Sequence, residues 1–458
     1  MDASYDLARY LVSTKYADIP TAAIEAAKKE VLDQLGVALG GSSRPGVAEL
    51  LALNKDWGGK PESTVFCFGD RLPAPMAAQV NATMGHALDY DDTGDGPTHP
   101  SVVIVPTAFA MAERRGTVSG QELLAAVATG ADVMCRLGAA WRQGRKSPNP
   151  GGHPGAGWHL TPLYGYFGAA AVAGRLLGLN ETGMVNALGI AYHQASGNGQ
   201  CVVDGALTKR MGPGFAARGG ITAAMMAARG ISGAQNCFEG ELGLFPLYHG
   251  GEYDRSALVK DLGREFRGVN VEMKPYPCCK GTHNFVAMTA ELVAKHHIKA
   301  ADVEEILIAC PGQANLALPL EVKAHPRNPV DSQFSIPWAV AVVVAHGKAG
   351  INDFNEQSIV SRDILGVCDK IRLDMAGRPG RSAVQITMRD GRVFSETRAG
   401  FGPGAETALP FSVYEDKFRD CVSYAARPIA VANTSRVVDL VRDLEQVADV
   451  AEIIRLIS

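Results

Sequence analysis

Apolar residues recur at helical spacing through about the first 270 residues of this chain. The segment 22–39, AAIEAAKKEVLDQLGVAL, shows this period clearly, and Gly40 and Gly41 after it predict where the helix ends. The same spacing predicts further helices at 77–92, 120–141, 167–179 and 219–230. Their many Ala and Gly residues indicate helices that pack closely together.

Beyond about residue 268 the pattern changes to the alternation typical of strands, at 303–312 and 369–377. Segment 383–400 also alternates, and the Asp390-Gly391 pair within it predicts a hairpin. Segment 331–347 reads instead as a buried helix, and helical spacing returns near the end of the chain, as in 435–450.

At 458 residues the chain is long enough for two domains. We therefore predict a mainly α fold with a large all-helical domain, formed by both chain ends, and a smaller inserted α+β lid domain. The helical domain would comprise 1–268 and 405–458, and the lid domain 269–404.

Composition and charge exclude several classes of partner. The chain has 44 basic and 48 acidic residues, a formal net charge of -4, which favours neither nucleic acid nor a membrane surface. Its N-terminus lacks a signal-peptide pattern, and the longest apolar runs, near 102–112 and 338–345, are about half a membrane span. We expect a cytoplasmic protein. The nine cysteines are scattered and form no C-x-x-C pair, so neither a disulfide framework nor a zinc or iron–sulfur site is expected.

The segment 86–101, HALDYDDTGDGPTHPS, concentrates carboxylates and imidazoles in an otherwise apolar region. A metal site, a phosphate-transfer aspartate, a proton-transfer site and a solvated loop are all open. If the preceding helix reaches Asp89, that residue and His86 share one face. Phosphatase nucleophiles of the D-x-D type follow a buried strand, whereas a helix is predicted here, and no familiar metal-ligand spacing is present. Asp95 reads as a loop residue, and His99 could simply start the next helix.

Three further positions carry chemistry-bearing side chains. His159 lies where the Gly- and Pro-rich segment 143–159, which could close over a ligand, meets a helix; a purely structural role is equally open. Lys209 and Arg210 precede a glycine-flanked break and a helix, an arrangement that could face an anion or be a solvated basic pair.

The third position is the segment 272–285, EMKPYPCCKGTHNF, at the expected domain boundary. Cys279 and His283 match a nucleophile and a base in residue type, although two adjacent cysteines, here Cys278 and Cys279, are often packed, inert thiols.

In this order the motifs HALDYDDT…THPS, GWH…GYFGAAAVAGRLLGL, TKRMGPGFAARGG and MKPYPCC.GTH resemble the MmgE/PrpD family over essentially the whole chain. That family includes 2-methylcitrate dehydratase, cis-aconitate decarboxylase and iminodisuccinate epimerase. The resemblance implies a helical domain with an α+β lid, a homodimer, and a small di- or tricarboxylate substrate. It also implies chemistry without a metal, nucleotide or organic cofactor.

The resemblance supplies the site residues too. Positions associated with the decarboxylase active site match Asp89, Thr93, His99, His159, Lys209 and Lys274. The predicted catalytic residues are thus His99, His159, Lys209, Lys274 and Cys279, with no metal ligand. The predicted substrate-binding residues are Asp89, Thr93, Arg210, Tyr276, Lys280 and His283.

Two departures bear on the reaction. Cys279 stands where the decarboxylase has an active-site His, and Ile336 stands where it has a Tyr. The epimerase has a Pro-x-Cys arrangement similar to the one around Cys279. We predict a hydro-lyase of the 2-methylcitrate dehydratase type, because that activity is common in the family. The alternatives are a dicarboxylate epimerase, then a decarboxylase or a catalytically silent carboxylate-binding protein.

Overall fold

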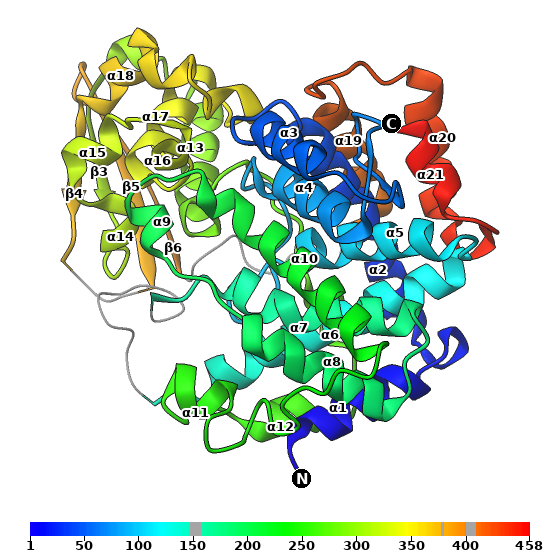
Figure 1. The fold of residues 1–458 in the computed structure, drawn as a ribbon. Coiled ribbons are helices and arrows are strands. Elements are labelled where there is room, and N and C mark those ends of the chain that lie inside the picture. Colours follow the sequence, from blue (N-terminus) through cyan, green and yellow to red (C-terminus); the bar gives the residue numbers. More distant parts are fainter. Residues whose placement is uncertain (147–156, 377–379, 400–408) are drawn as a thin grey trace.

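The computed structural model describes residues 1–146, 157–376, 380–399 and 409–458. Helices from both ends of the chain form one body, while the four-stranded sheet and its helices lie on the opposite side (Figure 1). The helices of the first body are α1 (Ala3–Ser13), α2 (Thr21–Gly41), α3 (Val47–Trp57), α4 (Ala74–His86), α5 (Ser101–Arg115), α6 (Gly120–Gly144), α7 (Leu160–Leu176), α8 (Glu181–Gln194), α10 (Thr208–Ala227), α11 (Leu244–His249) and α12 (Arg255–Val259). The short α9 (Gln200–Val203) lies beside the sheet part, where Val202 packs against its hydrophobic residues (Figure 1). The chain returns to the first body in α19 (Phe411–Val422), α20 (Val431–Arg442) and α21 (Ala451–Leu456). A mainly α protein is therefore confirmed.

The sheet contains β3 (Val303–Ala309), β4 (Ile371–Asp374), β5 (Arg381–Met388) and β6 (Val393–Ala399), in the order β4-β3-β5-β6. β3 pairs in parallel with β4 and antiparallel with β5, which forms the predicted hairpin with β6. Gly391 in its turn has φ +86°, the left-handed conformation that glycine adopts most readily. The helices of this part are α13 (His283–His296), α14 (Ala314–Ala317), α15 (Leu320–Ala324), α16 (Pro329–Gln333), α17 (Ile336–His346) and α18 (Arg362–Cys368). The short hairpin of β1 (Ser63–Thr64) and β2 (Arg71–Leu72) in the helical body is not predicted by the sequence pattern.

Buried hydrophobic residues gather in two large clusters. One draws its members from residues 3–273 and 414–457, and the other from residues 278–388. A small third cluster joins Val37, Leu88 and Cys421 to Ile351 and so lies between them. The division into a helical domain and a lid domain remains a prediction, and its second boundary, at 404–405, lies outside the described residues.

Several predicted helix ends are wrong. α2 runs through Gly40 and Gly41, because a Cβ on Gly41 would lie 2.1 Å from the main-chain oxygen of Met84; these glycines allow a close helix contact and do not stop the helix. α10 likewise continues through the Gly-Pro-Gly sequence at 212–214, where Gly214 lies against the backbone of α4. The predicted break there is absent.

Other predicted helix ends also differ from the observed ones. α4 ends at His86, six residues before the predicted end. The predicted helix at 331–347 is two helices, because Ser335 caps α17 by accepting a hydrogen bond from the N–H of Trp338. α7 begins at Leu160, earlier than predicted, and α20 ends at Arg442.

Among the described helices, α6 is long and apolar enough to cross a membrane. The sequence predicts apolar runs of only about half a membrane span. The most apolar stretch of α6 is entirely buried inside the protein, however. This burial accounts for its composition as that of a core helix.

Candidate active site

Asp89 lies at the centre of a buried group of charged and imidazole side chains. It follows the end of α4 and adopts φ +49°, a left-handed conformation that is uncommon outside glycine but tolerated by aspartate. The helix therefore does not extend to Asp89, and the predicted face shared by His86 and Asp89 is wrong. The turn, not the helix, directs the Asp89 carboxylate between the two large hydrophobic clusters.

Two lysines converge on this carboxylate. Lys274 Nζ donates to Asp89 Oδ2 over 3.0 Å and to the Asp89 main-chain oxygen over 2.9 Å, and Lys209 Nζ donates to Asp89 Oδ1. All three side chains are at most 5% exposed. Burial would lower the pKa of Lys274, but the charge of Asp89 outweighs it and raises that pKa to about 12. Lys209 lies in the first turn of α10, so the unbroken helix positions it.

The two ammonium groups keep hydrogen-bonding capacity. An ammonium has three N–H donors. Among the described residues, Lys209 Nζ uses one donor on Asp89 and lies 4.9 Å from the ring centre of Phe334, while Lys274 uses two. Together they carry one positive charge more than Asp89 neutralises, which suits a bound carboxylate.

His99 is held as a neutral base. Its Nδ1 contacts the main-chain oxygen of Asp92, and a carbonyl can only accept, so Nδ1 carries the hydrogen. Burial and the charge of Lys274 lower the pKa of His99 to about 3, which leaves Nε2 unprotonated. The main-chain N–H of His99 donates to Thr161 Oγ1 over 3.1 Å, which fixes His99 against α7.

His159 is the N-cap residue of α7, which agrees with its predicted place where a loop meets a helix. Its ring stacks on that of His86 with centres 5.5 Å apart and planes inclined by 19°. Burial and the charge of Lys209 hold the pKa of His159 well below its ordinary value. Residues 147–156, most of the segment predicted to close over a ligand, lie outside the described residues.

The acidic residues after Asp89 are structural members of the same cluster. Asp91 Oδ2 lies 2.7 Å from His86 Nδ1 and 3.8 Å from His99 Nδ1. Asp92 accepts a hydrogen bond from the Ser101 N–H over 3.0 Å, and burial together with the charge of Asp91 raises its pKa to about 8.

Thr93 joins this segment to the chain around residue 272. Its main chain exchanges two hydrogen bonds of 2.8 Å with Glu272, and its side-chain oxygen is buried without a hydrogen-bond partner in the described structure. Glu272 also pairs with Lys280 over 2.6 Å, so the Lys280 ammonium is committed to that carboxylate. Asp95, expected to be a loop residue, pairs with Arg142 and Arg267 at the edge of the cluster.

Cys279 approaches the cluster from the other side. Its N–H donates to the Gln333 main-chain oxygen over 2.9 Å, and the Gln333 side chain donates to the Ala87 oxygen over 3.1 Å. Burial and the negative charge of Asp89 raise the pKa of the Cys279 thiol, so it stays protonated and suits an acid better than a base. Cys278 is buried and contacts Thr282, which matches a packed thiol.

Three predicted substrate-binding residues are engaged elsewhere. His283 Nε2 donates to the Cys278 oxygen over 3.1 Å, and burial and the charge of Lys274 lower the pKa of His283 to about 3. The Tyr276 ring meets that of His283 edge-on at 5.3 Å. Arg210 is buried and donates to the Pro45 oxygen over 3.1 Å.

Two sets of side chains have the types and spacing for a metal ion. The ligand atoms of His86, Asp89 and Asp91, and those of Asp91, Asp92 and His99, lie within 4.8 Å of one another in each set. Both Asp89 oxygens already bind ammonium groups, and a further cation there would meet like charge. We therefore assign no metal to the set that contains Asp89.

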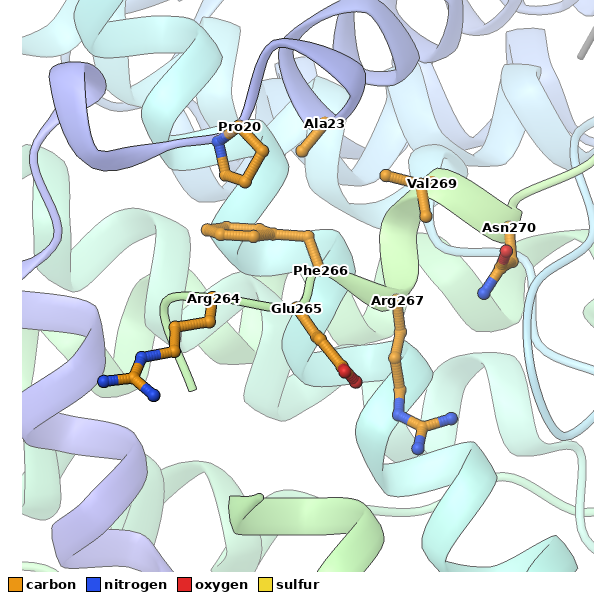
Figure 2. Close-up of a pocket in the computed structure, with 8 residues that line it drawn as sticks. All are labelled: Pro20, Ala23, Arg264, Glu265, Phe266, Arg267, Val269 and Asn270. Atoms are coloured by element: carbon orange, nitrogen blue, oxygen red, sulfur yellow. The ribbon is translucent and has the colours of Figure 1, made fainter. Parts of the chain in front are cut away.

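Two surface pockets of the described structure lie away from this cluster. One of about 360 Å³ is lined from α2 and the chain before residue 271 (Figure 2), and another of about 480 Å³ includes Arg71 and Arg455. Neither includes a predicted site residue. In the Asp89 cluster Lys274 is fully buried, whereas the His99 side chain is 14% exposed and His159 and Cys279 are half-buried.

This cluster connects the two parts of the sequence that family comparison also separates. The MmgE/PrpD N-terminal domain matches residues 5–256, and the MmgE/PrpD C-terminal domain matches residues 276–443. The chain belongs to the MmgE/PrpD family. Asp89, His99, His159 and Lys209 come from the N-terminal match, and Cys279 comes from the C-terminal match.

Relatives of this MmgE/PrpD protein cover nearly its full length. It is 26% identical to cis-aconitate decarboxylase of Homo sapiens, over 95% of this chain and 90% of that protein. It is 24% identical to cis-aconitate decarboxylase of Aspergillus terreus (96% and 93% covered) and 25% identical to the cis-aconitate decarboxylase-like protein oryM of Aspergillus oryzae (99% and 96% covered).

Neither His86 nor Asp91 is among the catalytic and substrate-binding residues that the sequence predicts. Both are fully buried beside the predicted residues of this MmgE/PrpD site. The available signal was their presence in one short polar segment of an apolar chain, but their pairing five residues apart depends on a turn that spacing alone does not reveal.

Proposed function

We propose that this protein carries out acid–base chemistry on a small di- or tricarboxylate, moving a proton at a carbon next to a carboxylate, without a metal or organic cofactor. One observation carries the proposal: the imidazoles of His99 and His159 and two lysine ammonium groups gather around Asp89. The ammonium groups suit the substrate carboxylates, and the imidazoles suit the proton.

The chemistry needs both components. A C–H bond beside a carboxylate is a weak acid, and its removal requires a positioned base together with stabilisation of the charge that builds on the carboxylate. Nε2 of His99 is the base that the described hydrogen bonds support, with His159 as the second imidazole. Lys209 and Lys274 stabilise the developing charge more strongly in this buried setting than they would in water.

Within this chemistry we propose first a hydro-lyase reaction of the 2-methylcitrate dehydratase type. Elimination of water requires a base for the C–H proton and an acid for the departing hydroxyl. A neutral imidazole and the protonated Cys279 thiol form such a pair.

Epimerisation of a dicarboxylate is the second candidate, and Cys279 favours it. An epimerase that uses two groups needs a base on one side of the carbon and a proton donor on the other, and a thiol can be that donor. Decarboxylation, the activity named for the relatives, is third. Cys279 and Ile336 replace the His and Tyr that the resemblance associates with that reaction. We also propose that the protein is a homodimer, as the resemblance implies, and that it is cytoplasmic.

A panel of di- and tricarboxylates assayed in heavy water tests these proposals. A hydro-lyase builds the absorbance of a conjugated enoate, an epimerase exchanges the hydrogen next to the carboxylate without enoate, and a decarboxylase releases carbon dioxide. Turnover should persist after exhaustive chelation. Loss of turnover on chelation, restored by a metal, would contradict the metal-free proposal, and binding of carboxylates without any turnover would favour a silent binding protein.

A further inference from the structure

His86 is a buried imidazole for which the proposed reaction has not yet been given a use. It is the last residue of α4, and its Nδ1 lies 2.7 Å from Asp91 Oδ2. Neither side chain is exposed to solvent. The pair therefore sits inside the protein, on the same turn that positions Asp89.

The hydrogen bond determines where the His86 proton lies. A carboxylate can only accept, so Nδ1 carries the hydrogen. Burial and the charge of Lys209 hold the pKa of His86 well below its ordinary value, so the ring has no second proton. Nε2 is consequently a hydrogen-bond acceptor.

This acceptor has no partner in the part of the chain that the structure describes. Nε2 of His86 is buried and makes no hydrogen bond there. An unsatisfied buried polar atom costs about 1–3 kcal/mol, and such atoms are rare unless a ligand or water completes them. Asp91 holds the ring so that this atom is presented in one orientation.

The location connects His86 to the proposed chemistry. Its ring centre lies 5.3 Å from that of His99 and 5.5 Å from that of His159. Lys209, which binds the central Asp89 carboxylate, is also the charged residue that acts most strongly on the His86 ring. His86 therefore lies close to both imidazoles, and the charges of both ammonium groups act on it.

We propose that His86 is a third acid–base residue of this site, acting through Nε2, and that Asp91 is the positioning residue that holds its Nδ1–H. The inference rests on the proposed function. In the step, Nε2 takes a proton from bound substrate or from a site water, and the electron pair of the broken bond stays on the donor. The Asp91 carboxylate balances the charge of the resulting imidazolium, which later returns the proton.

A bound cation is the competing use of the same atoms, because His86, Asp89 and Asp91 could together surround one. The two ammonium groups on Asp89 oppose it. Metal analysis of the purified protein decides between them, since a stoichiometric metal released only by chelation would overturn the acceptor assignment.

The variant His86→Asn tests the proposal, because its amide can still donate to Asp91 but offers nothing at the position of Nε2. Turnover of the polycarboxylate substrate should fall by at least about a hundredfold, as expected on loss of an acid–base group. His249→Asn is the matched control, since His249 is a buried imidazole that contacts Tyr164 Oη over 3.0 Å outside the site. Its turnover should stay near that of the unchanged protein.

A measurement independent of activity uses the full-length protein labelled with ¹⁵N in histidine. The His86 signals, identified by their loss in His86→Asn, should show the Nδ1–H tautomer, and added citrate should shift the Nε2 resonance. Asp91→Asn should reduce the population of the His86 Nδ1–H tautomer and lower turnover by about tenfold or more. A merely structural role of Asp91 would not produce this change of tautomer.

The outcomes separate the two proposals. Citrate that binds, by calorimetry, without moving the Nε2 resonance would overturn the role of His86 while leaving the proposed function intact. Near-normal turnover in His86→Asn would do the same. Failure of every polycarboxylate to bind or react would overturn both.

Discussion

Lys274 holds Asp89 at two points, its side-chain oxygen Oδ2 at 3.0 Å and its main-chain oxygen at 2.9 Å. The lysine belongs to the chain that leads into the second hydrophobic cluster, whereas Asp89 follows α4 of the helical body. One residue therefore fixes both the charge and the left-handed backbone of the other. The contact joins the two parts of the molecule at the candidate site.

Loss of the Asp89 charge should destabilise the protein. Asp89→Asn leaves two buried ammonium groups without their counter-charge, and we expect the free energy of unfolding to fall by about 3–5 kcal/mol in urea denaturation. The exposed pair of Asp390 with Arg392 provides the control, since Asp390→Asn should leave the free energy of unfolding nearly unchanged.

The same carboxylate predicts a pH dependence. Burial raises the pKa of Asp89, but the charges of Lys209 and Lys274 outweigh it and hold that pKa well below the ordinary value. The stabilisation is thus present above about pH 4, the ordinary range of the unfolded group, and is lost as pH falls through the lower folded pKa. The stability difference between the unchanged protein and Asp89→Asn should shrink below that pH. A difference that stays constant down to acid unfolding would contradict the ion-pair explanation.

Asp92 predicts the opposite trend. Its pKa is raised to about 8, so the folded protein keeps a proton that the unfolded chain loses near pH 4. Stability should therefore fall as pH rises from about 4 to 8, and Asp92→Asn should weaken this fall, because the amide is neutral throughout. Unfolding free energies at pH 5 and pH 8 for both proteins measure the effect; equal pH slopes would show that Asp92 does not titrate in this range.

Loss of a site cation or imidazole should greatly reduce turnover, while the protein stays folded. We expect Lys209→Ala and His159→Ala each to reduce turnover of the active carboxylate by at least about a hundredfold. Lys260→Ala and His193→Ala, at exposed positions, are the controls and should remain active. Near-normal rates in either site variant, with circular dichroism unchanged, would remove that residue from the proposed mechanism.

The adjacent cysteines should behave differently. If the Cys279 thiol donates a proton, Cys279→Ala lowers turnover by at least about a hundredfold, whereas Cys278→Ala, which removes a thiol that contacts Thr282, leaves the rate close to that of the unchanged protein. Turnover and melting temperature are measured together. Near-normal turnover in both variants would assign Cys279 to packing and remove the proposed proton donor from both the hydro-lyase and the epimerase candidates.

The sequence alone predicted which segments form helices and which form strands, because these depend on local periodicity. The long apolar helices, the strands of the sheet and the turn at Gly391 all follow from spacing and from turn chemistry. The motif resemblance indicated the family, and the family matches confirm it.

Only the tertiary structure decided where helices stop and which side chains meet. Gly41 and Gly214 do not interrupt their helices because neighbouring backbone packs against them, and that contact is invisible in one segment. Likewise His86 pairs with Asp91 rather than sharing a face with Asp89, because α4 ends at His86 and the left-handed turn at Asp89 redirects the chain. Contacts between residues far apart in sequence, such as Lys274 with Asp89, depend on packing free energy that no local pattern contains.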